Sequence, residues 1–179
     1  YRRCAVNTLR HKRRDRAFEP AMGDDEIIAG VSEHIERWLG PIESVFHELV
    51  SDLVHIDLFW VKPTAQRPFN TLVSAGMSAR PMTVPSGAED FALAELVLNL
   101  PPNWPMTHEA WESESSYWPI RLQKILARLP HEHQTWLSGG HTVQANFDGS
   151  PYHASTAFAG SVISPCISVP PEFSRLELG

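Results

Sequence analysis

The strand-like segment 54–61, VHIDLFWV, constrains the fold more than any other part of the chain. Its residues alternate between the two sides of an extended strand, and large apolar side chains stand on each side. One side holds Val54, Ile56, Leu58 and Trp60, and the other holds His55, Asp57, Phe59 and Val61. A strand with apolar groups on both sides needs a packed layer over each. We therefore expect a central strand in a sheet that is covered on both faces.

The segments around this strand predict its neighbours in the sheet. Residues 43–61 predict two strands about a short turn at Ser51 and Asp52, because β-branched and aromatic residues dominate and the pattern alternates. Two prolines then break the pattern, and residues 70–76 and 94–100 predict a third and a fourth strand. Four strands in close succession are typical of a meander, and so of a largely antiparallel sheet.

Two amphipathic segments predict helices that cover the sheet. In the first, residues 24–41, an aspartate can cap the start and a Gly-Pro pair can end the helix. Its apolar residues recur at helical spacing: Ile27, Ile28, Val31, Ile35, Trp38 and Leu39. The second, residues 118–129, has a serine cap at position 115 or 116 and Pro119 in its first turn. Its apolar stripe consists of Ile120, Ile125, Leu126 and Leu129.

The remaining segments complete an α+β domain. Residues 101–119 hold three tryptophans among polar residues and predict a long loop. Further strands are expected within residues 135–147 and 155–164, and residues 174–179 look like a strand that is cut short. This order of elements predicts a mixed, largely antiparallel central sheet with helices packed against it.

Charge divides the chain into a basic arm and an acidic body. The first 18 residues have a net charge of +6, which leaves −12 for the remainder of a chain whose total is −6. We interpret residues 1–22 as a basic N-terminal arm and residues 23–179 as one domain. An acidic body repels nucleic acid and favours basic protein partners. No apolar run approaches the ~20 residues of a membrane helix, so we expect no membrane partner. The two cysteines, Cys4 and Cys166, lie at opposite ends of the chain and form no disulfide framework or metal motif, so we expect a reducing, cytoplasmic setting.

His55 and Asp57 are the first candidates for catalysis, because two residues apart on one strand they would share a face. A histidine and an aspartate can act as a general base and its orienting group. No nucleophile stands out beside them, since Ser74 and Ser78 flank Gly76 instead of one serine being bracketed by glycines. We favour a structural hydrogen bond between His55 and Asp57, and keep a hydrolase as the alternative.

Three histidines, His131, His133 and His141, are the candidates for a metal site. Three imidazoles can bind zinc and leave one coordination position open. The spacing lacks the HExxH pattern that places two ligands and a base on one helix. Histidines just after a helix C-terminus are more often surface residues. We therefore expect no cofactor, with a metal-dependent enzyme as the alternative.

Aromatic residues gather in and beside the polar segment 101–119, at Trp104, Trp111, Tyr117 and Trp118. Exposed aromatic side chains are typical anchors of protein interfaces, although tryptophans can equally hold a loop against the core. Residue chemistry alone thus leans toward a binding module.

Several sequence blocks together resemble the Suppressor of fused domain family, in its bacterial form. The first blocks are His55-Ile56-Asp57, Pro63-Thr64, Arg67-Pro68-Phe69, TLVSAGMS at 71–78 and Pro81-Met82. The later blocks are AELVLNLPPNW, WPIRLQKILARLP and TWLSGGHTV, which follow in the order of the family and at about its spacing. The resemblance covers roughly residues 43–165.

The resemblance implies a compact mixed α/β domain that binds protein and has no cofactor or known enzymatic activity. The animal member holds zinc-finger transcription factors of the Hedgehog pathway inactive, and bacterial relatives are proposed to be immunity proteins of polymorphic toxin systems. A non-catalytic binding module, an immunity protein against a basic toxin, is therefore expected. By resemblance, the expected partner-binding residues are Gly76, Met77, Ser78, Arg80, Met82, Trp104 and Trp111.

Two departures from the animal pattern limit what carries over. Ala79 stands where the animal members have an acidic residue that engages the bound peptide, which argues against recognition of that peptide. The chain also ends at Gly179, before the further strand and the second domain of animal members. We therefore expect the domain to lack its C-terminal end.

Overall fold

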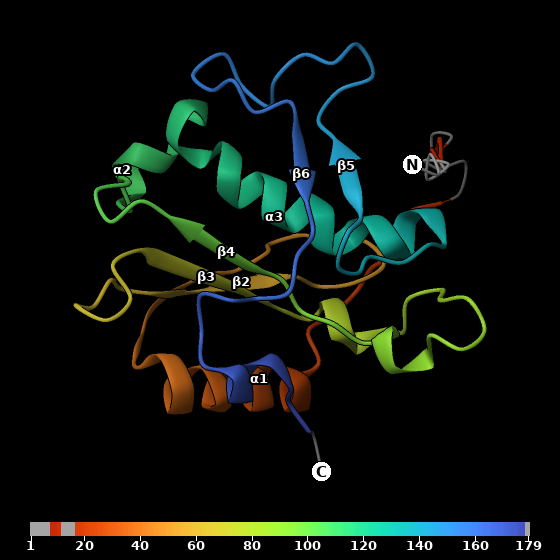
Figure 1. Ribbon diagram of the computed structural model, residues 1–179, viewed down its shortest axis with the longest axis horizontal. Helices are drawn as coiled ribbons and strands as arrows, with labels where there is room; N and C mark the ends of the chain where they lie inside the picture. Colours follow the sequence, from red (N-terminus) through yellow and green to blue (C-terminus); the bar gives the residue numbers. More distant parts are fainter. Residues whose placement is uncertain (1–7, 12–16, 178–179) are drawn as a thin grey trace, which may run out of the picture.

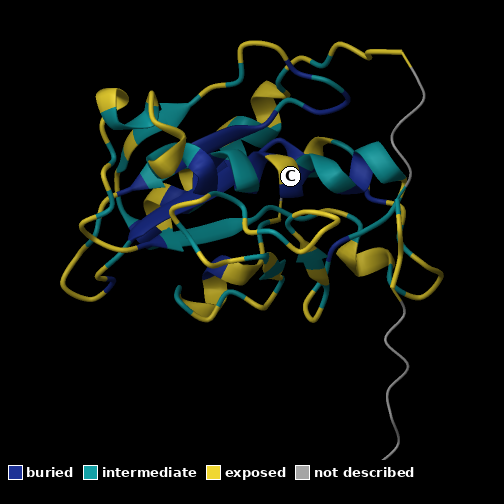
Figure 2. Ribbon diagram, turned by 90° about the horizontal axis from the view of Figure 1, so that it is seen from above, coloured by how far each residue is buried: buried dark blue, intermediate teal, exposed yellow. Residues whose placement is uncertain are grey.

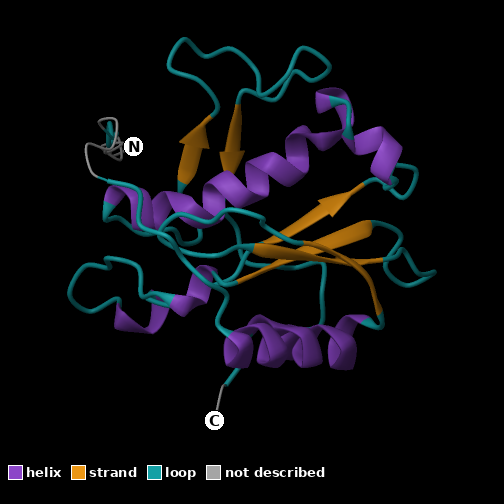
Figure 3. Ribbon diagram, turned by 180° about the vertical axis from the view of Figure 1, so that it is seen from behind, coloured by secondary structure: helices purple, strands orange, loops and turns teal. Residues whose placement is uncertain are grey.

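The computed structural model describes residues 8–11 and 17–177, so most of the predicted basic arm lies outside the described residues. The elements form successive layers (Figure 1). Helix α1 (Asp25–Leu39) lies on one face of a four-stranded sheet, and helix α3 (Glu114–His133) lies on the other. A hairpin of β5 (Thr142–Gln144) and β6 (Gly160–Val162) lies beyond α3. Seen from behind, the two helices again lie on opposite faces of the sheet (Figure 3).

The central sheet is an antiparallel meander, as predicted. Its strands lie in sequence order: β1 (Ile42–Phe46), β2 (Asp57–Val61), β3 (Asn70–Ala75) and β4 (Val97–Leu100). Every neighbouring pair is antiparallel. The α+β class is therefore confirmed.

The connection between β1 and β2 is longer than predicted. It runs over residues 47–56, so the short turn at Ser51 and Asp52 and the strand start at Val54 were wrong. Part of this connection pairs instead with an earlier segment: Ala21 N–H donates to Ser51 O at 3.1 Å, and Leu53 N–H donates to Glu19 O at 2.9 Å. These polar contacts replace the strand ladder that alternation alone suggested.

Both sides of β2 are buried, which confirms the two-sided cover predicted from residues 54–61. Leu58 packs in a cluster between the sheet and α3, and Phe59 and Val61 pack in a second cluster between the sheet and α1. Buried residues concentrate in the strands and on the inner sides of the helices (Figure 2). Each such side chain contributes about 1.5–3 kcal/mol relative to an exposed one.

Helix α1 begins and ends where its sequence signals lie. The side chain of Asp24 accepts hydrogen bonds from the backbone N–H groups of Glu26 and Ile27, and Gly40 follows the helix with a φ of 102°. Of its apolar residues, Val31, Ile35 and Leu39 are buried and the others are partly buried.

Helix α3 is longer than predicted and buries a different stripe. It begins at Glu114 after Ser113, so the caps at 115 or 116 were wrong and Pro119 lies in the second turn. Ile125 is 44% exposed, whereas Gln123 and Lys124 are buried. Their side chains donate to sheet carbonyls: Gln123 to Leu72 O and Leu96 O, and Lys124 to Phe46 O. Hydrogen bonds to the sheet therefore determine which side of α3 faces inward. A pattern of apolar residues cannot predict these bonds.

Two further predictions need correction. The segment 101–119 is not one long loop, because it contains the short helix α2 (His108–Trp111), capped by Thr107, and the start of α3. Residues 174–177 form no strand; a 3-10 turn, Pro171–Ser174, instead buries Phe173 against α1. None of the helices formed by the described residues has the length and apolarity needed to cross a membrane.

Candidate functional site

The segment Gly76–Met82 follows β3 and begins with a backbone conformation that requires glycine. Gly76 has a φ of +111°, and a Cβ atom at this position would lie 1.9 Å from His55 O. Real Cβ atoms do not approach a backbone oxygen this closely, and a positive φ adds strain for any other residue. Gly76 therefore serves close packing between two backbone segments.

The carboxylate of Glu95 holds this turn in place. Its Oε1 accepts hydrogen bonds from Gly76 N–H at 2.9 Å, Ser78 N–H at 2.9 Å and Ser78 Oγ at 2.6 Å. Its Oε2 accepts from Ser74 Oγ at 2.6 Å. Bonds to a charged acceptor are the stronger kind. Sequence reasoning missed Glu95, although a single acidic residue beside the apolar strand β4 is the kind of signal that could have drawn attention to it.

The residues predicted in this segment differ in their access to a partner. Met77 is 1% exposed and Met82 is 4% exposed, and both pack in the core between the sheet and α3. Ser78 is half-buried, and Arg80 forms an ion pair with Glu19 at 3.1 Å near the surface. The solvent-facing part of the segment is therefore confined to residues 78–81.

The two predicted tryptophans lie at a different place. The indole N–H of Trp104 donates to Ser116 O at 3.0 Å, and the ring of Trp111 packs on Phe46 with centroids 4.3 Å apart. Both tryptophans are half-buried and pack against the core, so they hold their segment onto the domain.

The structure does not bring the seven predicted residues into one patch. Trp104 contacts Ser116 near the start of α3, whereas His131 near the end of α3 contacts Met77 O. At 1.5 Å per residue, these two points on α3 lie about 22 Å apart.

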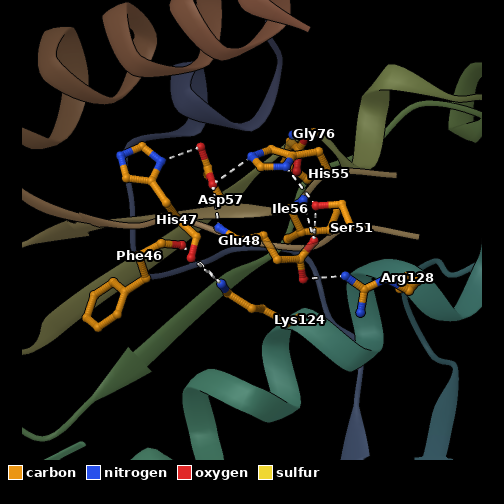
Figure 4. A network of polar contacts seen from close by, with 11 residues as sticks. Phe46, His47, Glu48, Ser51, His55, Ile56, Asp57, Gly76, Lys124 and Arg128 are labelled. Atoms are coloured by element: carbon orange, nitrogen blue, oxygen red, sulfur yellow. Dashed lines mark hydrogen bonds and ion pairs between the residues drawn. The ribbon is translucent and has the colours of Figure 1, made fainter. Parts of the chain in front are cut away.

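His55 and Asp57 lie in direct contact, with His55 Nε2 3.0 Å from Asp57 Oδ1 (Figure 4). Asp57 also lies 3.0 Å from His47 Nδ1 through Oδ2. The fold adds a residue that the sequence did not suggest, because Ser51 Oγ lies 2.7 Å from His55 Nδ1. A serine, a histidine and an aspartate thus contact one another in the order of a hydrolase triad.

The surroundings of Ser51 favour a structural role for this network. Its hydroxyl has one hydrogen, which it donates to Glu48 Oε2 at 2.8 Å, and Ser51 as a whole is 5% exposed. Glu48 in turn accepts from Ile56 N–H and forms an ion pair with Arg128. The hydroxyl therefore has neither a free proton to give to His55 nor an open path to a substrate. The network fastens the 47–56 connection to β2 and α3 (Figure 4).

Lys124 lies beside this network and is held away from water. Burial lowers the pKa of its ammonium group, while the nearby carboxylates of Glu48 and Asp57 oppose that effect. Its Nζ donates to Phe46 O at 3.1 Å. The lysine thus ties α3 to the end of β1.

The three histidines predicted as metal ligands make separate contacts. His131 is buried, with Nε2 3.1 Å from Met77 O. His133 stacks on the ring of His11, and His141 Nδ1 accepts from Ser138 N–H. No group of three histidine, cysteine, aspartate or glutamate residues within 8–11 and 17–177 is arranged to hold a metal ion.

The comparison with protein families decides what kind of domain carries this turn. A family model described as Suppressor of fused protein (SUFU) matches residues 52–179, well over half of the chain. The chain belongs to the Suppressor of fused family. No curated protein and no solved structure matches the chain.

Membership in the Suppressor of fused family suggests a protein-interaction or regulatory module, and the family is not a known enzyme family. The matched region contains the Gly76 turn, Glu95 and α3, whereas α1 and β1 precede it. Helix α1 nevertheless covers a whole face of the sheet and contacts Phe173. The packed structure of this Suppressor of fused domain therefore begins before residue 52, where the family match starts, and includes α1 and β1.

Proposed function

We propose that this Suppressor of fused domain is a non-catalytic, cytoplasmic immunity protein of bacterial type that binds and neutralises a basic toxin. Family membership supports the protein-binding part of the proposal. The acidic body, with a net charge of −12 outside the first 18 residues, supports a basic partner. The single observation that carries the proposal is that a Suppressor of fused domain has a strongly acidic body.

The distribution of charge on the described residues strengthens the acidic character of the surface. The outer side of α1 carries the exposed residues Asp25, Glu26, Glu33 and Glu36. Four of the eight lysine and arginine residues of the body are paired with acids: Lys62 with Glu43, Arg80 with Glu19, Arg121 with Glu114 and Arg128 with Glu48. An outward negative potential accelerates association with a basic partner and makes it sensitive to salt.

A surface at one end of the sheet is the proposed contact site. We define the sheet-end surface by Met22, Leu49, Val50, Ala79 and Arg80. Met22 follows Ala21, whose N–H donates to Ser51 O, so Met22 lies near the turn that holds the other two apolar residues. Met22, Leu49 and Val50 are 90%, 97% and 74% exposed. Exposed apolar side chains that gather in one place are typical of protein interaction sites.

A neutralisation experiment tests the proposed function. The full chain is co-expressed with candidate toxin domains from the source organism, and complexes are measured by titration calorimetry at low and high salt. We expect one toxin whose lethality is abolished, a one-to-one complex, and an affinity that falls with salt. Failure to protect cells from any candidate toxin, or binding unaffected by salt, would contradict the proposal.

Variants of the sheet-end surface locate the contact. Replacing both Leu49 and Val50 by serine is expected to lower the affinity at least about tenfold, a loss of about 1.4 kcal/mol of binding free energy. The matched control is Ile167→Ser, because Ile167 is 93% exposed and neighbours Ser168, which bonds to Asn99 on β4. Equal losses in both variants would show that the sheet-end surface is not the contact.

A serine hydrolase is the second candidate, because Ser51, His55 and Asp57 contact one another in triad order. A fluorophosphonate probe, which labels activated serines, tests it directly. We expect the probe to label wild type no more than it labels Ser51→Ala, since the Ser51 hydroxyl donates its hydrogen to Glu48. Labelling of wild type that is lost in Ser51→Ala would replace the binding proposal by an enzymatic one.

A further inference from the structure

The loop over residues 145–159, between β5 and β6, is long but tightly built. Its first half is closed by the side chain of Asn146, which donates to Ser150 O at 3.1 Å and to Pro151 O at 3.0 Å. Its second half is closed by Tyr152 N–H, which donates to Phe158 O at 2.9 Å. The hydroxyl of Tyr152 lies 2.6 Å from Ser161 Oγ on β6. The loop is therefore held in one shape before any partner arrives.

Aromatic stacking fastens this loop to α3. The rings of Trp118 and Tyr152 are nearly parallel, with an interplanar angle of 7° and centroids 5.8 Å apart. Phe158 packs against the same indole, with centroids 6.4 Å apart. Figures 1 and 3 show the loop beyond α3, on the side away from the sheet.

The same loop leaves two phenylalanines in water. Phe147 is 86% exposed and Phe158 is 67% exposed. An ordered loop that holds large apolar rings in water gives up the favourable free energy that burial of those rings would supply. Rigid aromatic side chains presented in this way are typical anchors of protein interfaces, because little conformational entropy is lost on binding.

Exposed carboxylates accompany these rings on the same surface. The exposed acids are Asp148, next to Phe147 on the loop, and Glu114 at the start of α3. Glu114 lies one turn before Trp118 on the same side of the helix and is paired with Arg121. Hydrogen bonds from the side chain and then the backbone N–H of Ser150 hold the pKa of Asp148 below its ordinary value. The surface therefore presents exposed phenyl rings together with carboxylates.

We propose that the aromatic loop surface, made of residues 145–159 and the first turns of α3, docks an arginine-bearing basic protein. An arginine side chain can lie flat on a phenyl ring and bond a neighbouring carboxylate at the same time. Like charge disfavours a second copy of this acidic chain and an anionic membrane as occupants. The inference rests on the proposed function as a protein-binding module and adds a second contact surface to it.

An oligoarginine peptide is the probe, and its contacts are mapped by chemical-shift changes in ¹⁵N-labelled full-length protein. We expect changes in the backbone signals of residues 145–159 and in the indole signal of Trp118. An oligolysine peptide of equal length is expected to bind more weakly, because an ammonium group does not stack on a ring as guanidinium does. Phe147→Ser is expected to weaken oligoarginine binding about tenfold.

The matched control is the double variant Leu49→Ser, Val50→Ser, which removes exposed apolar groups from the sheet-end surface and is expected to bind the peptide normally. Asp148→Asn, which keeps the size of the side chain, is expected to weaken binding severalfold. The proposal is overturned if the shifts fall on α1 instead, if Phe147→Ser binds like wild type, or if sedimentation shows self-association that Phe147→Ser abolishes.

The peptide experiment and the toxin experiment fail independently. If oligoarginine maps to the loop but no toxin is neutralised, the proposed immunity function fails and the aromatic loop surface stands. If a toxin is neutralised while the peptide maps elsewhere and Phe147→Ser retains peptide affinity, the aromatic loop surface fails alone.

Discussion

The Gly76–Met82 segment and the 145–159 loop both follow a strand, but they are built in opposite ways. The first directs its long apolar side chains inward, with Met77 and Met82 in the core and the turn held by Glu95. The second directs Phe147 and Phe158 outward on an equally ordered backbone. The difference teaches that a sequence block can identify a family through residues that are buried in the core, while the exposed rings belong to no such block.

The largest expected effect is the loss of the close packing at Gly76. Gly76→Ala adds a methyl group 1.9 Å from His55 O at a φ of +111°, so something in the backbone must shift. We expect a loss of about 3 kcal/mol or more in the free energy of unfolding, measured by urea denaturation.

Gly87→Ala is the matched control for this substitution. Gly87 also has a positive φ, of +88°, but no atom lies within 4 Å of an added Cβ. It therefore reports the cost of the dihedral angle alone, about 1–2 kcal/mol. If the two variants lose equal stability, close packing against His55 is not the reason why position 76 requires glycine.

Glu95→Gln is expected to have the next largest effect. The substitution keeps the shape of the side chain but replaces a charged acceptor of four hydrogen bonds by a neutral amide. We expect a loss of about 2 kcal/mol by urea denaturation, since bonds to charged groups are each worth about 1.5–3 kcal/mol.

The control for Glu95 is Glu89→Gln. Glu89 also accepts a backbone hydrogen bond, from Gly87 N–H, but it is exposed. Water can replace an exposed bond, so we expect a change within about 0.5 kcal/mol. If Glu89→Gln loses as much stability as Glu95→Gln, the partly buried position of Glu95 does not strengthen its hydrogen bonds.

A fall in pH should lower the stability of the fold through His131, whose Nε2 lies 3.1 Å from Met77 O. Burial lowers the pKa of His131 in the folded protein, against about 6.5 when unfolded. Between those values the unfolded chain binds more protons, so stability is lost as the pH falls below about 6.5. Glu132 and His133 adjoin it in sequence, and the Arg80 charge also lowers the pKa of His131. We expect His131→Gln to flatten the fall in melting temperature from pH 7 to pH 5; an unchanged slope would exclude His131 as its cause.

The sequence predicted the layers of the fold better than the candidate site. Alternation and helical spacing depend on which side chains are apolar, so the two-sided strand β2 and the caps of α1 were predicted correctly. Buried polar groups escaped the same reasoning. Gln123 is buried and Glu95 is partly buried, and both bond to backbone groups distant in the sequence.

Arg67 illustrates the same limit. Its buried guanidinium donates to Leu39 O and Lys62 O, which ties the end of α1 to the connection after β2. Desolvation lowers its pKa without removing its charge at neutral pH. Its place in a family block was visible in the sequence, but the carbonyl groups that surround it come from separate segments, and no local pattern specifies them. The contact of Ser51 with His55 was hidden for a similar reason, because the turn between them was expected to be shorter.

The smallest expected effect on stability belongs to the outward-facing loop, and it separates the two regions most clearly. Phe147 is 86% exposed, so Phe147→Ser removes little buried surface, and we expect the free energy of unfolding to change by less than about 0.5 kcal/mol. The same substitution should weaken oligoarginine binding about tenfold, whereas Gly87→Ala should leave that binding unchanged. A ring that matters for binding and not for folding is one presented to a partner. If urea denaturation shows instead that Phe147→Ser destabilises the domain as much as Glu95→Gln does, the ring supports the loop, and the contrast between an inward-facing turn and an outward-facing loop is lost.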